Sequence, residues 1–293
     1  MKNFLERLND EVLVCDGAMG TMLMKEGMPK GVCPEMWGIE NAKILTQIHN
    51  AYIDSGSDII TTNTFGANAI KLKKFNLEDK SYQINQEAAE LAKDVAGDKV
   101  YVFGDMGPTG SYLKPVGDIE PDYLLSIYAE QAKALEKGGV DAIILETFSD
   151  MEELKCAVMA VKENTKLPLI ASMTFNKLES KGFRTTSGIS IPQFVDNSLS
   201  SGCDVIGANC TLTAADIVDV VSEVRALGTA FIIVQSNAGM PKLDGEKVIY
   251  DESPEVFKKE IPRLIAAGAN IIGGCCGTTP EHINKIREFI NNR

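Results

Sequence analysis

Three cysteines of this sequence stand where they could hold one metal ion. Cys210 follows an apolar segment, and Cys275 and Cys276 are adjacent within a glycine-rich run, Gly273-Gly274-Cys275-Cys276-Gly277. Cysteine thiolates bind zinc at about 2.3 Å, and a site with three protein ligands keeps a fourth position open for a substrate. The glycines around the pair allow a backbone turn that directs both sulfur atoms to one point. The three residues are therefore candidate zinc ligands.

Two other interpretations stay open on the residue types alone. Buried cysteines are often inert packing residues, and an adjacent pair such as Cys275–Cys276 could act as a redox sensor. Against the redox interpretation, adjacent cysteines form strained disulfides, and a cytosolic chain rarely keeps them. We interpret the other four cysteines as packing residues: Cys15, Cys33, Cys156 and Cys203.

Eight short apolar runs recur along the chain and predict the elements that must position these cysteines. Each run is continuous and rich in β-branched residues, which is typical of parallel strands buried on both faces. Amphipathic segments separate the runs, for example 150–164, where Ser149 and Glu152 predict a capping box. The runs are 12–15, 58–61, 100–103, 142–145, 168–171, 205–208, 231–234 and 270–273.

Eight strand–helix units over 293 residues match a (β/α)8 TIM barrel, an α/β fold, as one domain spanning 1–293. The doubly wound open sheet has the same alternation of strands and helices, but the glycine motifs of dinucleotide-binding and phosphate-binding loops are missing. In a barrel the active site lies at the carboxyl ends of the strands. Cys210 follows the sixth predicted strand and Cys275–Cys276 follow the eighth, so the three can meet at the barrel mouth.

The composition excludes two classes of partner. A formal net charge of −12 argues against nucleic acid and against anionic membrane surfaces. No apolar run approaches the roughly 20 residues that span a bilayer. The first residues become charged too soon for a signal peptide. We therefore expect a cytoplasmic protein.

Several strand-end motifs together resemble the homocysteine S-methyltransferase family, and within it the homocysteine-binding barrel of cobalamin-dependent methionine synthase. In order along the chain they are Asp16-Gly17-Ala18-Met19-Gly20-Thr21, Thr62-Asn63-Thr64-Phe65-Gly66, Gly107-Pro108-Thr109-Gly110, Glu146-Thr147-Phe148, Gly207-Ala208-Asn209-Cys210 and the run 273–282 that begins with the glycine-flanked cysteines.

The resemblance implies one zinc ion per chain on Cys210, Cys275 and Cys276. It also implies a set of homocysteine-binding residues: Asp16, Gly17, Thr62, Phe65, Glu146 and Asn237. A metal-bound thiolate is a far better nucleophile than a thiol. We therefore expect the cysteines to activate the homocysteine thiol, while Glu146 and Asp16 accept hydrogen bonds from its ammonium group. Phe65 would pack on the methylene chain, and Asn237 would lie next to the metal.

The methyl donor stays open. The chain has no Asp-x-His-x-x-Gly pattern for cobalamin attachment, so methylcobalamin would have to be carried by another protein or domain. A small sulfonium, S-methylmethionine or S-adenosylmethionine, could instead enter directly. A third possibility is a non-catalytic homocysteine-binding module of a larger methyltransferase assembly.

Overall fold

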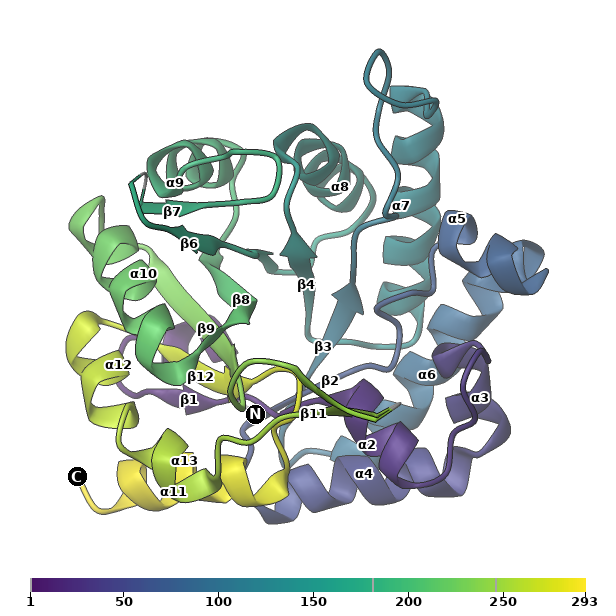
Figure 1. The fold of residues 1–293 in the computed structure, drawn as a ribbon. Coiled ribbons are helices and arrows are strands. Elements are labelled where there is room, and N and C mark those ends of the chain that lie inside the picture. Colours follow the sequence, from purple (N-terminus) through teal and green to yellow (C-terminus); the bar gives the residue numbers. More distant parts are fainter. Residues whose placement is uncertain (1, 181, 246) are drawn as a thin grey trace.

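Eight parallel strands form one sheet in the computed structural model, which describes residues 2–180, 182–245 and 247–293. The sheet order is β1-β12-β9-β8-β5-β4-β3-β2, and a bridge between Cys15 and Ile59 joins its two edges into a barrel (Figure 1). Each predicted apolar run is confirmed as a strand. The strands are β1 (Leu13–Val14), β2 (Ile59–Thr61), β3 (Tyr101–Met106), β4 (Ala142–Phe148), β5 (Leu169–Met173), β8 (Val205–Thr213), β9 (Phe231–Asn237) and β12 (Ile271–Gly274).

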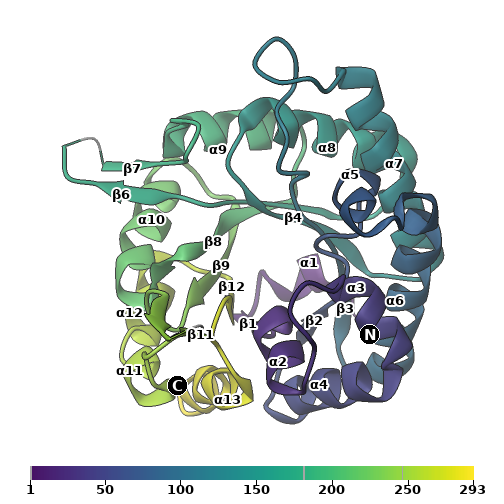
Figure 2. The same ribbon diagram turned by 45° about the vertical axis from the view of Figure 1, so that its right-hand side comes forward.

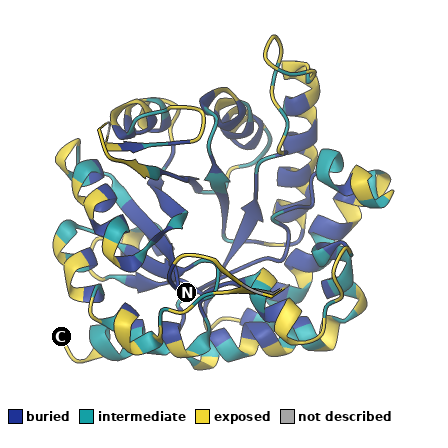
Figure 3. Cartoon of the chain, viewed as in Figure 1, coloured by how far each residue is buried: buried dark blue, intermediate teal, exposed yellow. Residues whose placement is uncertain are grey.

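The strands are apolar on both faces because they separate two cores. Successive side chains point to opposite faces of a strand. Residues such as Phe103, Ile144 and Ile233 pack together inside the barrel with one another. Their strand neighbours, among them Val102 and Ile143, pack outward against the helices. Figure 3 shows the strands almost wholly buried, while the helices expose their outer faces.

Helices alternate with the strands and surround the barrel (Figure 2). They are α1 (Phe4–Arg7), α2 (Met19–Lys25), α3 (Pro34–Glu40), α4 (Ala42–Asp54), α5 (Ala69–Leu72), α6 (Ser81–Ala96), α7 (Pro121–Lys137), α8 (Met151–Asn164), α9 (Ile191–Ser200), α10 (Ala214–Ala226), α11 (Pro254–Lys258), α12 (Ile261–Ala267) and α13 (Pro280–Asn291), with two 3-10 turns, η1 (Lys73–Phe75) and η2 (Glu78–Lys80).

The cap predicted for α8 is wrong by one residue. Asp150, not Ser149, is the N-cap, and its side chain accepts hydrogen bonds from the backbone N–H groups of Glu152 and Glu153. A carboxylate at this position also interacts favourably with the helix dipole. At α13 the expected cap is confirmed, since Thr279 precedes Pro280 in the first turn.

Loops on the mouth side of the barrel carry structure that the apolar runs do not reveal. Two hairpins, β6 (Asn176–Leu178) with β7 (Gly182–Arg184) and β10 (Lys242–Asp244) with β11 (Lys247–Ile249), follow the fifth and seventh barrel strands. The β6–β7 hairpin projects beyond the ring of helices in Figure 2. These short, largely exposed strands have no continuous apolar core and so give little sequence signal.

The other end of the barrel is closed by α1, where Phe4 stacks against Tyr101 and Phe103. Next to it, Asp58 accepts hydrogen bonds from Val14 N and from the guanidinium groups of two arginines, Arg7 and Arg287. These contacts tie the first two strands to the last helix. Within the described ranges, every helix is too short or too polar to cross a membrane.

Candidate active site

The three cysteines singled out in the sequence meet at the mouth of the barrel. The Sγ atoms of Cys210 and Cys276 are 3.9 Å apart, and all three sulfur atoms lie within 4.8 Å of one another. Tetrahedral zinc with sulfur ligands at about 2.3 Å requires sulfur atoms about 3.8 Å apart. The donor set and its spacing therefore fit a zinc ion.

The backbone of β9 fixes Cys275 and Cys276. Cys275 N donates to Ser236 O at 2.7 Å, and Ala238 N donates to Cys276 O at 3.0 Å. The Thr278 hydroxyl also donates to Cys275 O at 2.7 Å. A Cβ atom at Gly274 would lie 2.3 Å from the Thr278 hydroxyl oxygen, so the glycine before the pair makes this turn possible.

Cys210 is positioned by an unusual backbone. Cys210 and Thr211 have positive φ angles of 62° and 50°, a conformation that costs non-glycine residues free energy. Hydrogen bonds hold the segment on both sides. Thr174 Oγ1 donates to Asn209 O at 2.9 Å, and Thr211 Oγ1 donates to Phe175 O at 2.7 Å. The strain is therefore supported by β5 and the loop that follows it.

Asn209 connects this segment to β4. Its Oδ1 accepts hydrogen bonds from Thr147 N at 2.9 Å and Ser172 Oγ at 2.8 Å, and its Nδ2 donates to Thr147 Oγ1 at 2.7 Å. Thr147 itself has a φ of 63°. Thr147 directly follows Glu146, and Asn209 directly precedes Cys210. The side chain of Asn209 therefore links the strand that carries Glu146 to the strand that carries Cys210.

Hydrogen bonding among the thiols sets their acidity before any metal binds. The hydrogen bonds from Cys210 and Cys275 hold the pKa of Cys276 well below its usual value. The pKa of Cys275 is raised well above its usual value by its hydrogen bonds to the same two partners. One thiolate is therefore stabilised among neighbouring S–H donors, which prepares the cluster for a cation.

A layer of polar side chains lies above the apolar interior of the barrel. It is formed by inward-facing residues near the carboxyl ends of several strands. Gln235 of β9 donates to Glu146 of β4 at 3.4 Å across the barrel, although the two strands are not neighbours. The members of this polar layer are Thr61, Asp105, Glu146, Ser172, Asn209 and Gln235.

Two predicted acidic residues are both at the mouth but in different surroundings. Asp16 is buried and accepts hydrogen bonds from Thr61 N at 2.8 Å and from the Thr61 hydroxyl at 3.3 Å. Burial raises its pKa to about 7. Burial, and then the charge of Asp16, raise the pKa of Glu146 to about 7 as well. Both carboxyl groups would be stabilised in the charged form by a cationic ligand.

The remaining predicted substrate residues surround these acids. The Thr62 hydroxyl accepts a hydrogen bond from Asp105 N at 2.9 Å. Phe65 is partly buried, with Lys71 Nζ 4.1 Å from its ring centroid. At Gly17 a Cβ would lie 2.7 Å from the Thr278 hydroxyl, so this glycine lets the first and last strand ends approach.

Asn237 is the seventh-strand residue expected beside the metal. It is buried at the end of β9, and its Oδ1 has no hydrogen-bond partner among the described residues. A buried amide oxygen without a donor is costly, so it is suited to a ligand or a cation.

Sequence reasoning missed three residues of the site. Asp105 and Gln235 belong to the polar layer, and each has one buried side-chain oxygen without a partner in the described chain. Tyr250, just after β11, is a further residue whose side chain lowers the pKa of Cys276. Asp105 could have been found as the inward residue after Tyr101 and Phe103, whereas Tyr250 carries no local signal.

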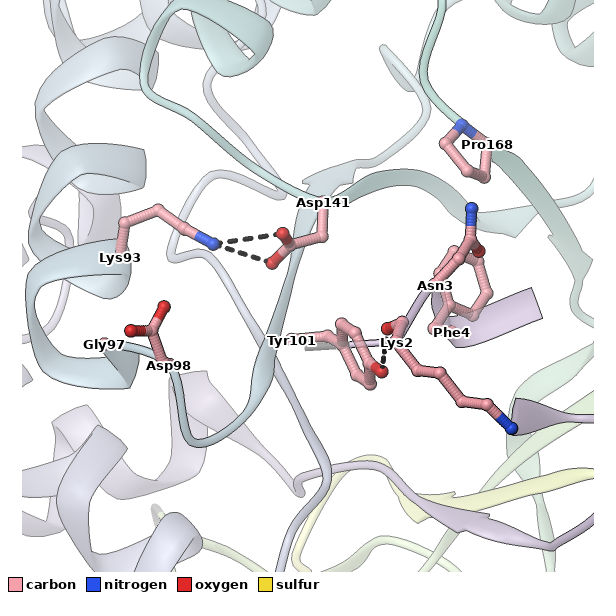
Figure 4. A pocket seen from close by; sticks show the side chains of 9 residues that line it. All are labelled: Lys2, Asn3, Phe4, Lys93, Gly97, Asp98, Tyr101, Asp141 and Pro168. Carbon is pink, nitrogen blue, oxygen red and sulfur yellow. Dashed lines mark hydrogen bonds and ion pairs between the residues drawn. The ribbon is translucent and has the colours of Figure 1, made fainter. Parts of the chain in front are cut away.

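A separate pocket of about 270 Å³ lies at the opposite end of the barrel (Figure 4). Its acidic and basic groups are partly satisfied already, since Lys93 pairs with Asp141 at 2.8 Å and Tyr101 donates to Lys2 O. Residues at this end of a TIM barrel contribute to stability rather than to chemistry. The cysteine cluster is therefore the better candidate for the active site.

Comparisons with known proteins place nearly the whole chain in one enzyme family. The model of the family described as homocysteine S-methyltransferase matches residues 13–290. Methionine synthase of Mycobacterium leprae is 30% identical over 306 aligned residues, which cover 97% of this chain and 25% of that protein. The chain thus spans about a quarter of the length of this relative.

Two solved structures share the fold. The metallated form of the homocysteine methyltransferase MmuM from Escherichia coli has a TM-score of 0.81 and 20% identity, covering 97% of this chain and 98% of that one. A methyltransferase from Methanosarcina mazei has a TM-score of 0.63 and 12% identity, covering 99% and 97% of the two chains. At these identities the likeness supports the barrel architecture.

Proposed function

This chain belongs to the homocysteine S-methyltransferase family, and from that premise we propose that it methylates homocysteine to methionine on a zinc site formed by Cys210, Cys275 and Cys276. The observation that carries the proposal is the convergence of the three sulfur atoms within 4.8 Å at the barrel mouth. The relative named methionine synthase supports methionine as the product.

Bound zinc would act as a Lewis acid with one open coordination position, where it would keep the substrate thiol deprotonated. The chain's own residues do the rest of the work. Glu146 accepts the substrate ammonium, and Gln235 holds the Glu146 carboxylate in place across the barrel. Asp16 adds negative charge at the same end of the site, while Gly17 keeps the first strand end close to Thr278.

Phe65 and Thr62 complete the proposed substrate site on the second strand. Phe65 offers an apolar surface to the methylene groups, and Thr62 supports the neighbouring strand through Asp105 N. Asn237 Oδ1, which has no partner among the described residues, would be available to the fourth metal position when substrate is absent. The whole of 1–293 acts as one homocysteine-binding barrel in this proposal.

We propose methylcobalamin, held by a separate corrinoid protein or domain, as the methyl donor. The resemblance of the strand-end motifs to methionine synthase supports this choice. The alternative donors are S-methylmethionine and S-adenosylmethionine. The alternative function is a homocysteine-binding module that catalyses no methyl transfer. We also infer a cytoplasmic location, supported by seven cysteines that are all free thiols.

Metal analysis and turnover test the proposal together. Purified protein should contain one zinc per chain, Cys210→Ala should lose it, and the matched variant Cys156→Ala, in α8, should keep it. Methionine should form from homocysteine with methylcobalamin, free or on a corrinoid protein, and not with the two sulfonium donors. If the protein binds zinc and homocysteine but forms no methionine with any donor, the result would support a non-catalytic binding module. A protein that contains no metal would support the redox alternative.

A further inference from the structure

Asp105 belongs to the polar layer but has no role in the function proposed above. It lies near the end of β3, two residues after Phe103 and four after Tyr101, which both pack inside the barrel. Because alternate residues of a strand share a face, Asp105 faces the inside of the mouth. The residue is 6% exposed, so its carboxyl group has little access to water.

The backbone of Asp105 is held by two threonines of the second strand end. Thr62 Oγ1 accepts a hydrogen bond from Asp105 N at 2.9 Å, and Thr64 Oγ1 donates to Asp105 O at 2.6 Å. The two hydroxyl groups also bond to each other at 2.6 Å. The backbone that carries the carboxyl group is therefore held in place before a ligand arrives, which lowers the cost of ordering the site on binding.

One oxygen of this carboxyl group is left for a ligand. Asp105 Oδ1 is buried and has no hydrogen-bond partner in the part of the chain that the structure describes. Leaving a buried acceptor unpaired costs about 1–3 kcal/mol, and more for a charged group. Asp16, by contrast, already accepts hydrogen bonds from Thr61. Of these two acids, Asp105 is thus the one with an oxygen to spare.

The charges around Asp105 call for a cation. Burial and then the negative charge of Glu146 raise the pKa of Asp105 well above its usual value. Lys71, whose ammonium group lies over the ring of Phe65, lowers the pKa of Asp105 by less than burial and Glu146 raise it. A cationic group between Asp105 and Glu146 would relieve the repulsion between them.

The cysteines and the acidic residues lie on different strands of the barrel mouth, an arrangement that suits an amino acid with a thiol at the end of its side chain. Glu146 interacts electrostatically with both Cys276 and Asp105, while Asp105 lies on β3, across the barrel from the cysteine strands. A ligand whose sulfur lies at the cysteines of β8 and β12 would therefore direct its other end toward β3 and β4.

We propose that Asp105, together with Glu146, binds the α-ammonium group of the substrate and makes the site selective for thiols that carry this group. This inference rests on the proposed function, because it takes homocysteine as the substrate.

Binding of two thiols tests the inference. L-Homocysteine and 4-mercaptobutanoate differ only in the ammonium group, and calorimetric titration of the zinc-loaded protein gives both dissociation constants. We expect Asp105→Asn to weaken homocysteine binding about ten- to hundredfold, the effect of losing a hydrogen bond to a charged group. Binding of 4-mercaptobutanoate should stay within about twofold, because a merely structural role would weaken both ligands.

The matched control is Asp204→Asn. Asp204 precedes β8 at the far end of the barrel, where its Oδ2 accepts a hydrogen bond from Leu169 N at 2.8 Å. This variant should leave both constants unchanged. Asp105→Ser provides a second variant if Asp105→Asn fails to fold, with the same selective loss expected.

The outcomes separate the two proposals. Wild-type protein that binds homocysteine, with Asp105→Asn or Asp105→Ser binding it equally well, would overturn this inference and leave the proposed function intact. An equal loss for both thiols would also overturn it and assign Asp105 a structural role. Wild-type protein that binds no homocysteine would overturn the proposed function and this inference with it.

Discussion

Removing the side chain of Asn209 should destabilise the protein well beyond a typical polar substitution. Asn209→Ala deletes three hydrogen bonds, two partly buried bonds to Thr147 and one buried bond to Ser172. At about 1 kcal/mol for each bond, the expected loss in the free energy of unfolding is about 3 kcal/mol. With an unfolding entropy of about 2.1 cal/mol/K per residue, this loss lowers the melting temperature of a 293-residue domain by about 5 °C.

Differential scanning calorimetry measures this shift, and Ser172→Ala is the matched control. The control removes only one of the three bonds, so we expect a loss of about 1 kcal/mol and a decrease below about 2 °C. Only Asn209→Ala should also weaken zinc binding in a chelator competition, because Asn209 precedes Cys210. A decrease for Asn209→Ala no larger than that for Ser172→Ala would refute the reasoning, since the two bonds to Thr147 would then contribute nothing.

Three further predictions concern buried or partly buried acids. The pKa of Glu146 is raised from 4.5 to about 7, so wild-type protein loses stability as the pH rises through that range. Glu146→Gln does not ionise and should therefore gain stability relative to wild type between pH 5 and pH 8. Urea titrations without substrate should show a gain of up to about 3 kcal/mol. Asp58→Asn should lower the melting temperature by about 3 °C, because it removes ion pairs with Arg7 and Arg287. The proposed methyl transfer, at the other end of the barrel, should stay unchanged. Glu153→Gln should make the 107–120 loop more sensitive to limited proteolysis. Glu153 accepts charge-assisted hydrogen bonds from Thr109 N at 2.7 Å and from Thr109 Oγ1 at 2.6 Å. Unchanged cleavage would show that the loop is held by other contacts.

The barrel could be predicted because its strands are buried on both faces. That burial requires continuous apolar runs, which are local and visible in the sequence. The cysteines could be placed at one end for a related reason, since Cys210 and Cys275 directly follow such runs. The last helix was also predictable, because Thr279 and Pro280 form a local cap and first turn.

Features that depend on how strands pair could not be predicted in the same way. The bond between Asp16 and Thr61 N exists only because the first strand lies beside the second in the closed barrel. The unpaired oxygen of Asp105 is likewise a property of the assembled mouth rather than of its own segment. The cap of α8 was misplaced because Ser149 and Asp150 are both good caps, and the backbone geometry selects between them.

Backbone strain and the Asn209 side chain together fix the distance between the two ends of the site. Thr147, beside Glu146, and Cys210 both have positive φ angles, and each such residue costs about 1–3 kcal/mol. Such conformations persist only where the surrounding contacts determine them. The Asn209 side chain supplies these contacts for Thr147, and the hydroxyl groups of Thr174 and Thr211 supply them on either side of Cys210. The Asn209 side chain therefore links the proposed zinc-ligand segment of β8 to the segment of β4 that carries Glu146. A substrate that must reach both does not have to order the protein on binding, so more of its interaction energy remains for holding the thiol in place.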